Sequence, residues 1–202
     1  MINVLEALQL VKDKNEKRFP HILGTYEIAS ALAKHYNVDL YKAQVAAIFH
    51  DYAKNESIET MKHIIKEHCN PIYLQYSENV LHAPVARYIL EKEFKINDKQ
   101  ILEAVEYHVT GHPEMDDIAK IVFISDYIEK GRKHPSVEFG RYLSKISLEV
   151  AVLGICEETI KYLTETIKEQ QIHPYLFDTY QKYLEKVGEV YYESIKDNYK
   201  RY

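Results

Sequence analysis

Apolar residues recur along almost the whole chain at intervals of three or four positions, which is the period of an amphipathic α-helix. Val4, Leu5, Leu8 and Val11 form the first such stripe. Runs that alternate between apolar and polar residues, the pattern of a half-buried β-strand, are absent from the sequence. The pattern therefore predicts an all-α protein with about ten helices.

Capping residues and short polar connectors divide this pattern into segments. Beyond the first stripe, we expect helices over 18–36, 40–54, 58–69, 78–94, 98–110, 116–130, 136–153, 155–171 and 175–198. Asp39, Ser57 and Asp98 each stand where a side-chain oxygen can accept hydrogen bonds from the free N–H groups of the helix that follows. Pro20 is compatible with the first turn of its helix, because the N–H groups there have no intrahelical partner.

Length and composition suit one domain. The chain has 202 residues, of which 46% are hydrophobic, and only 6 are Gly and 6 are Pro. This is enough apolar material for a core and too few turn residues for an all-β fold. We predict a single domain over 1–202, with 175–202 as a C-terminal helical extension. The Tyr-, Lys- and Glu-rich composition of that extension is typical of a surface helix, and a homodimer or other partner surface is the alternative.

Charge and cysteine content exclude several classes of protein. Lys and Arg number 26 against 31 Asp and Glu, a net charge of −5, so a basic nucleic-acid-binding surface is not expected. Apolar runs fall short of the ~18 residues that cross a bilayer, and the first residues lack the apolar block of a signal peptide. Cys69 and Cys156 stand far apart, without the CxxC spacing of a thiolate metal site. We therefore expect a cytoplasmic protein with neither nucleic-acid nor membrane partners.

Polar residues interrupt the apolar pattern in four segments, 46–54, 80–86, 104–112 and 121–132. In each, a His or Asp stands where the helical period would place a core residue. Asp126 is the clearest case, because its helix is apolar on most sides. A buried carboxylate is costly unless a cation compensates it, so we expect an Arg, a Lys or a metal ion beside Asp126.

These interruptions supply candidate metal ligands. Imidazoles and carboxylates are common ligands of divalent iron, manganese, cobalt and zinc, and side chains from several helices can converge inside a bundle. A single His on an apolar helix face is more often a hydrogen-bonded core residue, so the hypothesis depends on the whole set. Three basic residues, Arg18, Lys54 and Arg132, stand close to these positions in sequence and would attract phosphate, with a solvated surface charge as the alternative for each.

The order of these residues resembles a known family. His21, His50–Asp51 and Asp126 match, in order, the H…HD…D signature of HD-domain metal-dependent phosphohydrolases. His82 and His108 match the two further histidines of the subgroup that has room for two metals. More narrowly, the segments RFPHILG, IFHDYAK, LHAPVA, HVTGH and ISDYIEKGR resemble the YqeK branch, the symmetrical bis(5′-nucleosyl)-tetraphosphatases of bacteria. The chain departs from that branch at Ala83, Ser125 and Lys130, none of which is a candidate ligand.

The resemblance implies that the predicted helices form an HD-domain helical bundle, and it implies an activity and a metal centre. It makes the six residues metal ligands, with Asp51 bridging two metals and with His82 and His108 completing the second site. Iron is the implied metal, and manganese or cobalt are the alternatives. The implied reaction splits diadenosine tetraphosphate at its middle into two ADP molecules, so the expected partners are a dinucleoside polyphosphate and ADP- or GDP-like products.

The chemistry of phosphoanhydride hydrolysis assigns further roles. Divalent ions bind phosphate oxygens and lower the pKa of a bound water. Asp51 and Lys54 are the expected catalytic residues, with Lys54 holding the attacked phosphate, while Arg18 and Arg132 balance charge on the phosphates. The other expected substrate contacts lie in the loop after His108: Thr110, Gly111 and His112.

Two alternatives to this activity stay open at the level of sequence. The first is a related HD phosphohydrolase that acts on a nucleoside monophosphate or a guanosine alarmone. The second is a helical binding module that keeps a structural metal without turnover. A structural site saturates its metal with protein ligands, whereas a catalytic site keeps an open position. Basic residues beside the ligands favour the catalytic reading.

Overall fold

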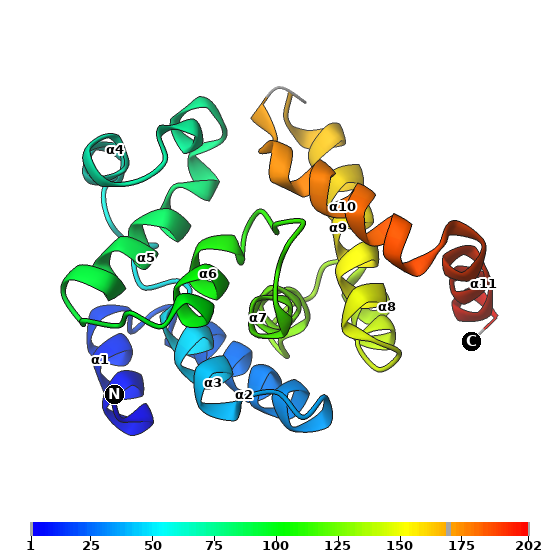
Figure 1. The fold of residues 1–202 in the computed structure, drawn as a ribbon, viewed down its shortest axis with the longest axis horizontal. Helices are drawn as coiled ribbons and strands as arrows, with labels where there is room; N and C mark the ends of the chain where they lie inside the picture. Colours follow the sequence, from blue (N-terminus) through cyan, green and yellow to red (C-terminus); the bar gives the residue numbers. More distant parts are fainter. Residues whose placement is uncertain (1, 169–170, 202) are drawn as a thin grey trace.

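The computed structural model describes residues 2–168 and 171–201 of the chain. These residues form eleven α-helices and two short 3₁₀-helices and contain no β-strand (Figure 1). The all-α class predicted from the sequence is confirmed. In chain order the elements are α1 (Val4–Lys14), α2 (Phe19–His35), α3 (Leu40–Phe49), α4 (Ile58–His68), η1 (Pro71–Gln75), η2 (Glu78–Val80), α5 (His82–Lys92), α6 (Lys99–Tyr107), α7 (Asp117–Ile128), α8 (Val137–Leu143), α9 (Leu148–Thr166), α10 (Pro174–Val187) and α11 (Glu189–Lys200).

The predicted helix starts are confirmed where a capping residue stood in the sequence. The Asp39 carboxylate accepts from the backbone N–H of Lys42 at 3.0 Å, and the Ser57 hydroxyl accepts from the N–H of Thr60 at 3.1 Å. Asp98 caps α6 in the same way. Each of these bonds satisfies a backbone donor that the helix itself leaves free, which is why the residue type alone located the start.

Several of the predicted boundaries are wrong. The α-helix predicted over 78–94 begins only at His82, after η2, and the helix predicted over 155–171 ends at Thr166, with positions 169–170 outside the described residues. The segment around 153–155 is continuous helix, and the break lies earlier, where the Ser147 hydroxyl accepts from the N–H of Val150 at 3.1 Å and starts α9. The segment 175–198 is two helices, because Gly188 adopts a φ of 85° that ends α10. The start of α9 and the break at Gly188 are local backbone events that a stripe of apolar residues does not register.

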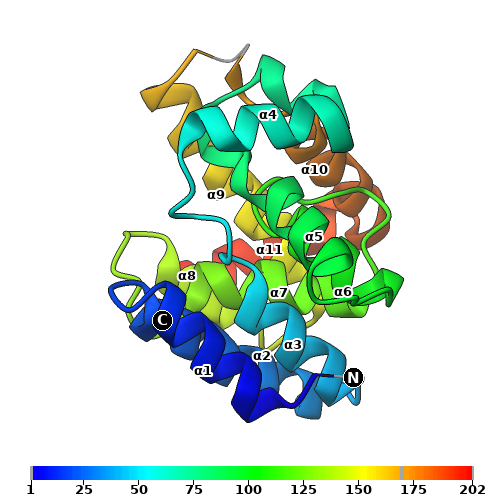
Figure 2. The same cartoon turned by 90° about the vertical axis from the view of Figure 1, so that its left-hand side faces the viewer.

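Helix α7 is the centre of the bundle. It packs against α2, α3, α6, α8 and α9, and Figure 1 shows it between the α2–α3 pair and the α8–α9 pair. Ile121, Val122 and Ile124 on α7 are fully buried. Figure 2 shows α1 and α2 toward the bottom of the view, α4 at the top and α5 between them. A polar group on α7 therefore faces elements from widely separated parts of the chain.

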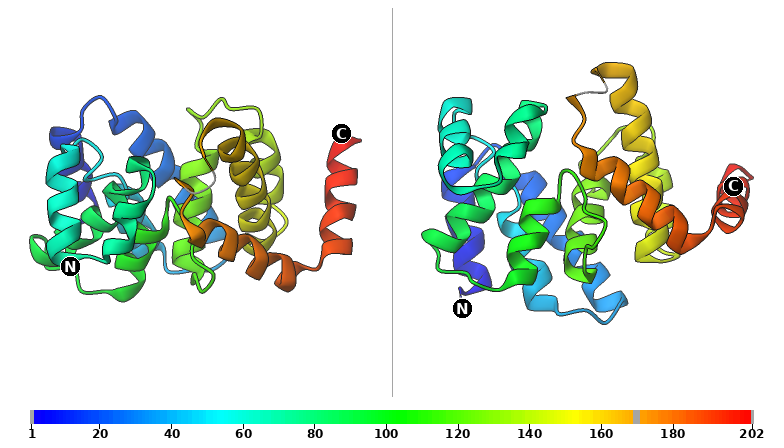
Figure 3. Two further views of the ribbon diagram at one scale, coloured as in Figure 1. Left: turned by 90° about the horizontal axis from the view of Figure 1, so that it is seen from above. Right: turned by 45° about the horizontal axis from the view of Figure 1, so that its top comes forward.

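The C-terminal helices cover the far side of α9. Helix α10 packs along α9 and buries Leu176 and Tyr183, and Figure 3 shows α11 beyond it at the edge of the molecule. Tyr192 and Ile195 of α11 are buried nonetheless. Among the described residues, no helix combines the length and the hydropathy that crossing a lipid bilayer requires.

Candidate metal centre

The adjacent pair His50–Asp51 lies in a tight turn at the end of α3. The helix predicted over 40–54 ends at Phe49, and the backbone continues in turns in which the N–H of Tyr52 bonds to the carbonyl of Phe49 at 3.0 Å. The His50 and Asp51 side chains are almost completely buried. The turn, rather than a continued helix, directs both side chains into the protein interior.

The first set of ligand atoms gathers around one oxygen of Asp51. His21, near the start of α2, places its Nε2 atom 3.2 Å from Asp51 Oδ2 and 3.1 Å from Asp126 Oδ1. His50 Nε2 lies 3.1 Å from the same Asp51 oxygen and 3.2 Å from His21 Nε2. Asp126, on α7, is thus within reach of the His50–Asp51 pair, as the metal hypothesis requires. His21, His50 and Asp126 can each offer one ligand atom to a common ion.

The second set gathers around the other oxygen of Asp51. His82, the first residue of α5, places its Nε2 atom 3.1 Å from Asp51 Oδ1 and 3.2 Å from the Nε2 atom of His108, which follows α6. His108 Nε2 lies 3.8 Å from the same oxygen. Asp51 therefore stands between two sets of imidazoles, the arrangement expected of a carboxylate that bridges two metals.

The protonation of these rings fits a cation. The Nδ1 atoms of His50 and His108 lie 2.7 Å from the carbonyl oxygens of Ala47 and Val105. A carbonyl only accepts, so the neutral rings carry their proton on Nδ1 and present a lone pair at Nε2. The lone pairs at Nε2 face the negatively charged oxygens of Asp51, and the two repel each other unless a cation lies between them. The donor set therefore fits a divalent metal that accepts nitrogen and oxygen ligands.

The pKa values of the histidines shift in different directions across the cluster. Burial lowers the pKa of His82 and, together with the nearby His50 and His82 rings, lowers the pKa of His108 well below its usual value. Burial also acts to lower the pKa of His21, but hydrogen bonds to Asp126 and Asp51 outweigh it and raise that pKa to about 9. In the metal-free protein, a proton on His21 therefore provides part of the positive charge that the carboxylates attract.

The pKa values of the two carboxyl groups, Asp51 and Asp126, are lowered in the folded protein. Burial alone would raise the pKa of Asp51 and of Asp126. The nearby His50 ring and hydrogen bonds with His21 and His82 hold the pKa of Asp51 well below its usual range, and a hydrogen bond with His21, the His50 ring and Arg132 do the same for Asp126. Both groups are thus carboxylates, the form that binds a metal ion.

Three basic side chains surround the ligands, as the sequence predicted. Arg18 contacts Asp51 through its Nε atom, and Arg132 contacts the Asp126 carboxylate while its Nε donates to the Asp126 carbonyl at 2.8 Å. The expected cation beside Asp126 is therefore Arg132. Lys54 Nζ lies 3.3 Å from His82 Nδ1, and burial lowers the pKa of this lysine.

The loop after His108 packs elsewhere. The buried Thr110 hydroxyl donates to the carbonyl of Gly111 at 2.9 Å, and Gly111, with a φ of 65°, approaches Thr179 of α10 closely. The His112 ring stacks on Tyr107 with their centroids 4.4 Å apart. Thr110, Gly111 and His112 thus fill the junction of α6 with α10, and their contact with a substrate stays a prediction.

A pocket of about 430 Å³ opens beside the cluster. Its lining includes His108, Asp126 and Arg132. Further lining residues come from α7, the loop after it and α9, namely Tyr127, His134, Glu158, Thr159 and Tyr162. Sequence reasoning missed this second group, because nothing in its spacing brings α9 next to α7. It also missed Glu129, a buried carboxylate next to His21, although the sequence carries it within the ISDYIEKGR segment.

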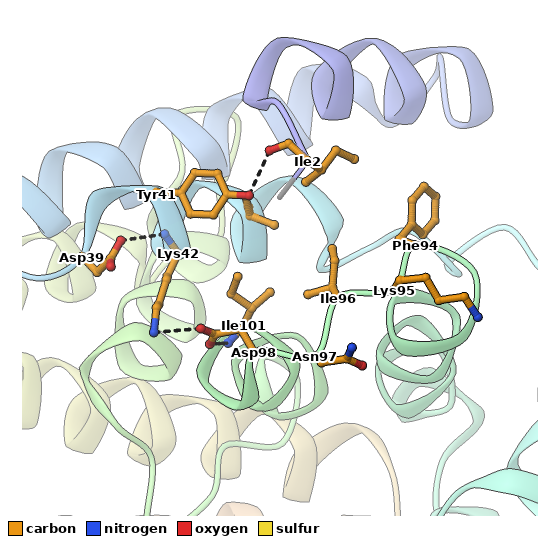
Figure 4. A pocket seen from close by; sticks show the side chains of 11 residues that line it. Ile2, Asp39, Tyr41, Lys42, Phe94, Lys95, Ile96, Asn97, Asp98 and Ile101 are labelled. Carbon is orange, nitrogen blue, oxygen red and sulfur yellow. Dashed lines mark hydrogen bonds and ion pairs between the residues drawn. The ribbon is translucent and has the colours of Figure 1, made fainter.

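Another pocket, of about 500 Å³, contains none of the candidate ligands in its lining (Figure 4). The Tyr41 hydroxyl donates to the carbonyl of Ile2 at 2.9 Å, and Lys42 pairs with Asp98 at 2.8 Å, as the dashed lines in Figure 4 mark. Phe94 and other apolar side chains form much of the remaining wall. Because Tyr41, Lys42, Asp39 and Asp98 bond to one another or to the backbone, this pocket is a weaker candidate for chemistry than the cluster, where imidazoles and carboxylates converge.

A family model described as the HD domain matches residues 18–131, which contain all six candidate ligands together with Arg18 and Lys54, while Arg132 directly follows the matched range. The chain belongs to the HD domain family. The resemblance that the sequence motifs suggested is thereby confirmed, and the HD pair of the family's name is His50–Asp51 in this HD-domain protein.

Individual proteins with similar sequences or structures are more specific than the family model. The symmetrical bis(5′-nucleosyl)-tetraphosphatase of Halalkalibacterium halodurans is 40% identical over 181 residues, covering 89% of this chain and 96% of the relative. The symmetrical bis(5′-nucleosyl)-tetraphosphatase of Bacillus subtilis is 37% identical with the same coverage. A crystal structure from Clostridium acetobutylicum, of a protein described as a predicted HD superfamily hydrolase involved in NAD metabolism, superposes with a TM-score of 0.83 at 29% identity, over 92% of this chain and 99% of that one.

Proposed function

We propose that this HD-domain protein is a metal-dependent symmetrical bis(5′-nucleosyl)-tetraphosphatase that hydrolyses diadenosine tetraphosphate to two ADP molecules. The observation that carries the proposal is the cluster itself, in which Asp51 stands between two sets of imidazoles and cationic side chains flank the carboxylates. The extent of similarity to the two tetraphosphatases supports the choice of substrate, because their matched regions cover nearly the whole of each relative.

The proposed ligands are His21, His50, Asp51, His82, His108 and Asp126. Iron is the proposed metal, with manganese or cobalt as alternatives, since each accepts imidazole and carboxylate ligands. When bound, such ions lower the pKa of a coordinated water and neutralise charge on the phosphate oxygens. The protein contributes the orientation of the ligands: backbone carbonyls hold the His50 and His108 rings by Nδ1, so that Nε2 of each faces the centre.

The basic residues are proposed to bind the phosphate chain. Lys54 lies beside His82 on the Asp51 Oδ1 side, where its ammonium group can hold the attacked phosphate. Arg18 and Arg132 lie beside Asp51 and Asp126, and their guanidinium groups are placed to balance charge on the neighbouring phosphates. A purely structural metal site has no need of these cations, so their presence favours an enzyme over a binding module.

The pocket beside the cluster is proposed to hold one nucleoside. Its volume, about 430 Å³, lies in the range of ~300–1,000 Å³ that small-molecule sites occupy. Tyr127 and Tyr162 supply aromatic surface on which a base can pack, and Glu158 and Thr159 supply polar groups. Asp126 and Arg132 line both this pocket and the cluster, so a nucleoside bound in the pocket would direct its phosphates toward the metal centre.

Product analysis tests the proposal. Purified protein, loaded with iron under anaerobic conditions, is incubated with diadenosine tetraphosphate, and the nucleotides are separated by ion-exchange chromatography. We expect ADP as the product. Formation of ATP and AMP would contradict symmetric cleavage. Failure to cleave this substrate, combined with release of phosphate from a nucleoside monophosphate or from a guanosine alarmone, would favour a related HD phosphohydrolase instead.

Three expectations from the sequence stay predictions beside this proposal. They are the cytoplasmic location, the homodimer, and the treatment of 1–202 as one domain with 175–202 as an extension. The two helices α10 and α11, which include most of that extension, contribute no side chain to the cluster or to the adjoining pocket.

A further inference from the structure

The carboxylate of Glu129 contacts the His21 ring on the side that faces away from Asp51 and Asp126. Glu129 follows directly after α7 and is only 4% exposed. Its Oε1 atom lies 3.3 Å from Nδ1 of His21, while the Nε2 atom of the same ring faces Asp51 and Asp126. Its second oxygen accepts from the backbone N–H of Gly131 at 2.5 Å. The His21 ring is thus held between a carboxylate on one nitrogen and the metal cluster on the other.

This contact decides which nitrogen of His21 is available. A metal bound at Nε2 requires the ring proton to be on Nδ1, where an acceptor must receive it. The Glu129 carboxylate only accepts, so it holds the proton on Nδ1 and the lone pair on Nε2. His50 and His108 are oriented by backbone carbonyls in the same way, so His21 differs from them by having a charged side chain in this role.

Two glycines make room for the carboxylate. A Cβ atom at Gly24, one turn after His21 on the same face of α2, would lie 2.5 Å from Glu129 Oε2. A Cβ atom at Gly131 would lie 2.9 Å from Oε1. Neither contact is sterically acceptable, so an alanine at either position displaces the carboxylate from His21. The glycines of the RFPHILG and EKGR segments are thereby explained by one buried side chain.

The turn that carries Glu129 has a separate support. Arg141 of α8 donates from Nη2 to the Glu129 carbonyl at 2.8 Å and from Nε to the Ile128 carbonyl at 3.0 Å. These bonds hold the backbone and leave the Glu129 side chain free for another role. The Glu129 carboxylate also lies 4.0 Å from Nε of Arg132, so all of its side-chain partners, His21 and Arg132, belong to the metal cluster or border it.

We propose that Glu129 is a positioning residue of the metal centre, seated by Gly24 and Gly131, that fixes the tautomer and orientation of His21. The inference rests on the metal ligands of the proposed function and not on its substrate. It predicts that the charge and the placement of this carboxylate set the metal affinity of the centre.

Manganese binding to purified, metal-stripped protein tests this role without any turnover. Free Mn²⁺ is titrated by electron paramagnetic resonance against the wild type, Glu129→Gln and Gly24→Ala. We expect both variants to bind Mn²⁺ about tenfold to a hundredfold more weakly. The double variant is expected to bind no more weakly than the weaker single variant, because both changes remove the same contact.

The matched control is Glu27→Gln. Glu27 is an exposed carboxylate on α2 that pairs with Lys130 at 2.8 Å, so its loss removes the same charge near the site without touching His21. We expect wild-type Mn²⁺ affinity for this variant. Thermal unfolding of each metal-free variant reports folding separately from metal binding.

Wild-type Mn²⁺ affinity in Glu129→Gln would overturn the proposal, as would wild-type affinity in Gly24→Ala. A fall in the unfolding temperature of the metal-free variants with unchanged affinity would assign Glu129 a structural role and also overturn it. Weakened Mn²⁺ binding in protein that makes no ADP from diadenosine tetraphosphate would support the role of Glu129 and contradict the proposed substrate, so the two failures are distinguishable.

Discussion

The two sides of the Asp51 carboxylate provide different environments. On the Oδ1 side, His82 and His108 are each 3% exposed, burial lowers the pKa of both rings, and Lys54 is the adjoining cation. We call this the deep side. On the Oδ2 side, the side chains of His21 and Asp126 are 15% and 19% exposed, and Arg132 lies at the edge of the pocket. We call this the shallow side.

The difference separates two tasks within one cluster. The deep side has neutral rings that are held by the interior of the protein, which suits tight retention of a metal. The shallow side has more charge and more exposure, and it contributes Asp126 and Arg132 to a pocket large enough for a small molecule, which His108 of the deep side also lines. We therefore expect substrate to approach from the shallow side, and each prediction below tests this distinction.

The largest effect is expected from Asp51→Ala, because this carboxylate contacts the imidazoles of both sides. Its loss should abolish metal loading and reduce hydrolysis to background, since the remaining rings have no shared anion to offset a cation. Metal content by atomic absorption and turnover of diadenosine tetraphosphate measure the two effects. Far-ultraviolet circular dichroism should still show a helical protein. Full hydrolysis by metal-free Asp51→Ala protein would defeat the proposed mechanism.

Lys54→Ala tests the deep side. We expect the metal to be retained and kcat to fall about 10²–10³-fold, because a buried cation is removed from the attacked phosphate. Steady-state kinetics and metal analysis on the same preparation check this. Lys62→Ala is the control, since Lys62 is an exposed lysine that pairs with Glu78 on another face. Unchanged kinetics in Lys54→Ala would remove this lysine from the site.

Arg132→Ala tests the shallow side. Its guanidinium lines the pocket and pairs with Asp126, so we expect a rise in KM together with a fall in kcat of about tenfold to a hundredfold. Lys130→Ala, which removes an exposed cation two positions away, should leave both constants unchanged. An effect on kcat alone would place Arg132 with Lys54 and contradict the difference between the two sides.

Tyr162→Ala tests the outer part of the pocket. Tyr162 lines it from α9 and is 63% exposed, so it can cover one face of a bound base. Loss of a base–aromatic contact is worth about 1–3 kcal/mol, and we expect KM to rise about tenfold with kcat retained. Tyr191→Ala, an exposed tyrosine on α11, is the control. Equal KM values for Tyr162→Ala and the wild type would remove the nucleoside from this pocket.

The smallest effect concerns the stability of the metal-free protein as a function of pH. The pKa of His21 is raised to about 9 in the folded protein, above its unfolded value of about 6.5. Its contribution to stability is therefore fully present below pH ~6.5 and is lost as the pH rises through about 9. Urea unfolding at pH 6 and pH 10 should show this loss, and His21→Gln should reduce it. An equal loss in His21→Gln protein would assign the effect to other groups.

The candidate ligands could be named from the sequence through its resemblance to a family, and their role as ligands stays a prediction. The helices that carry His21, His82 and Asp126 could also be predicted, whereas His50, Asp51 and His108 lie in turns after α3 and α6 that were predicted as helix. Asp126 was recognisable because a carboxylate in an apolar helix needs a cation wherever the helix packs. The starts of α3, α4 and α6 were recognisable because a capping side chain bonds within its own turn. The role of Glu129 could not be predicted, because no pattern in the neighbouring sequence indicates that the His21 ring lies against it.

The sequence by itself thus determined what depends on neighbours along the chain: an all-α protein, its capped helix starts, and the residue types able to bind a metal. The tertiary structure decided what depends on separate helices meeting. It brought α2, α5, α6 and α7 around Asp51, opened the pocket between α7 and α9, and packed Thr110–His112 against α10 instead. The physical reason is that helix periodicity and capping act over a few residues, whereas the distance between two helices is set by the packing of all the apolar faces at once.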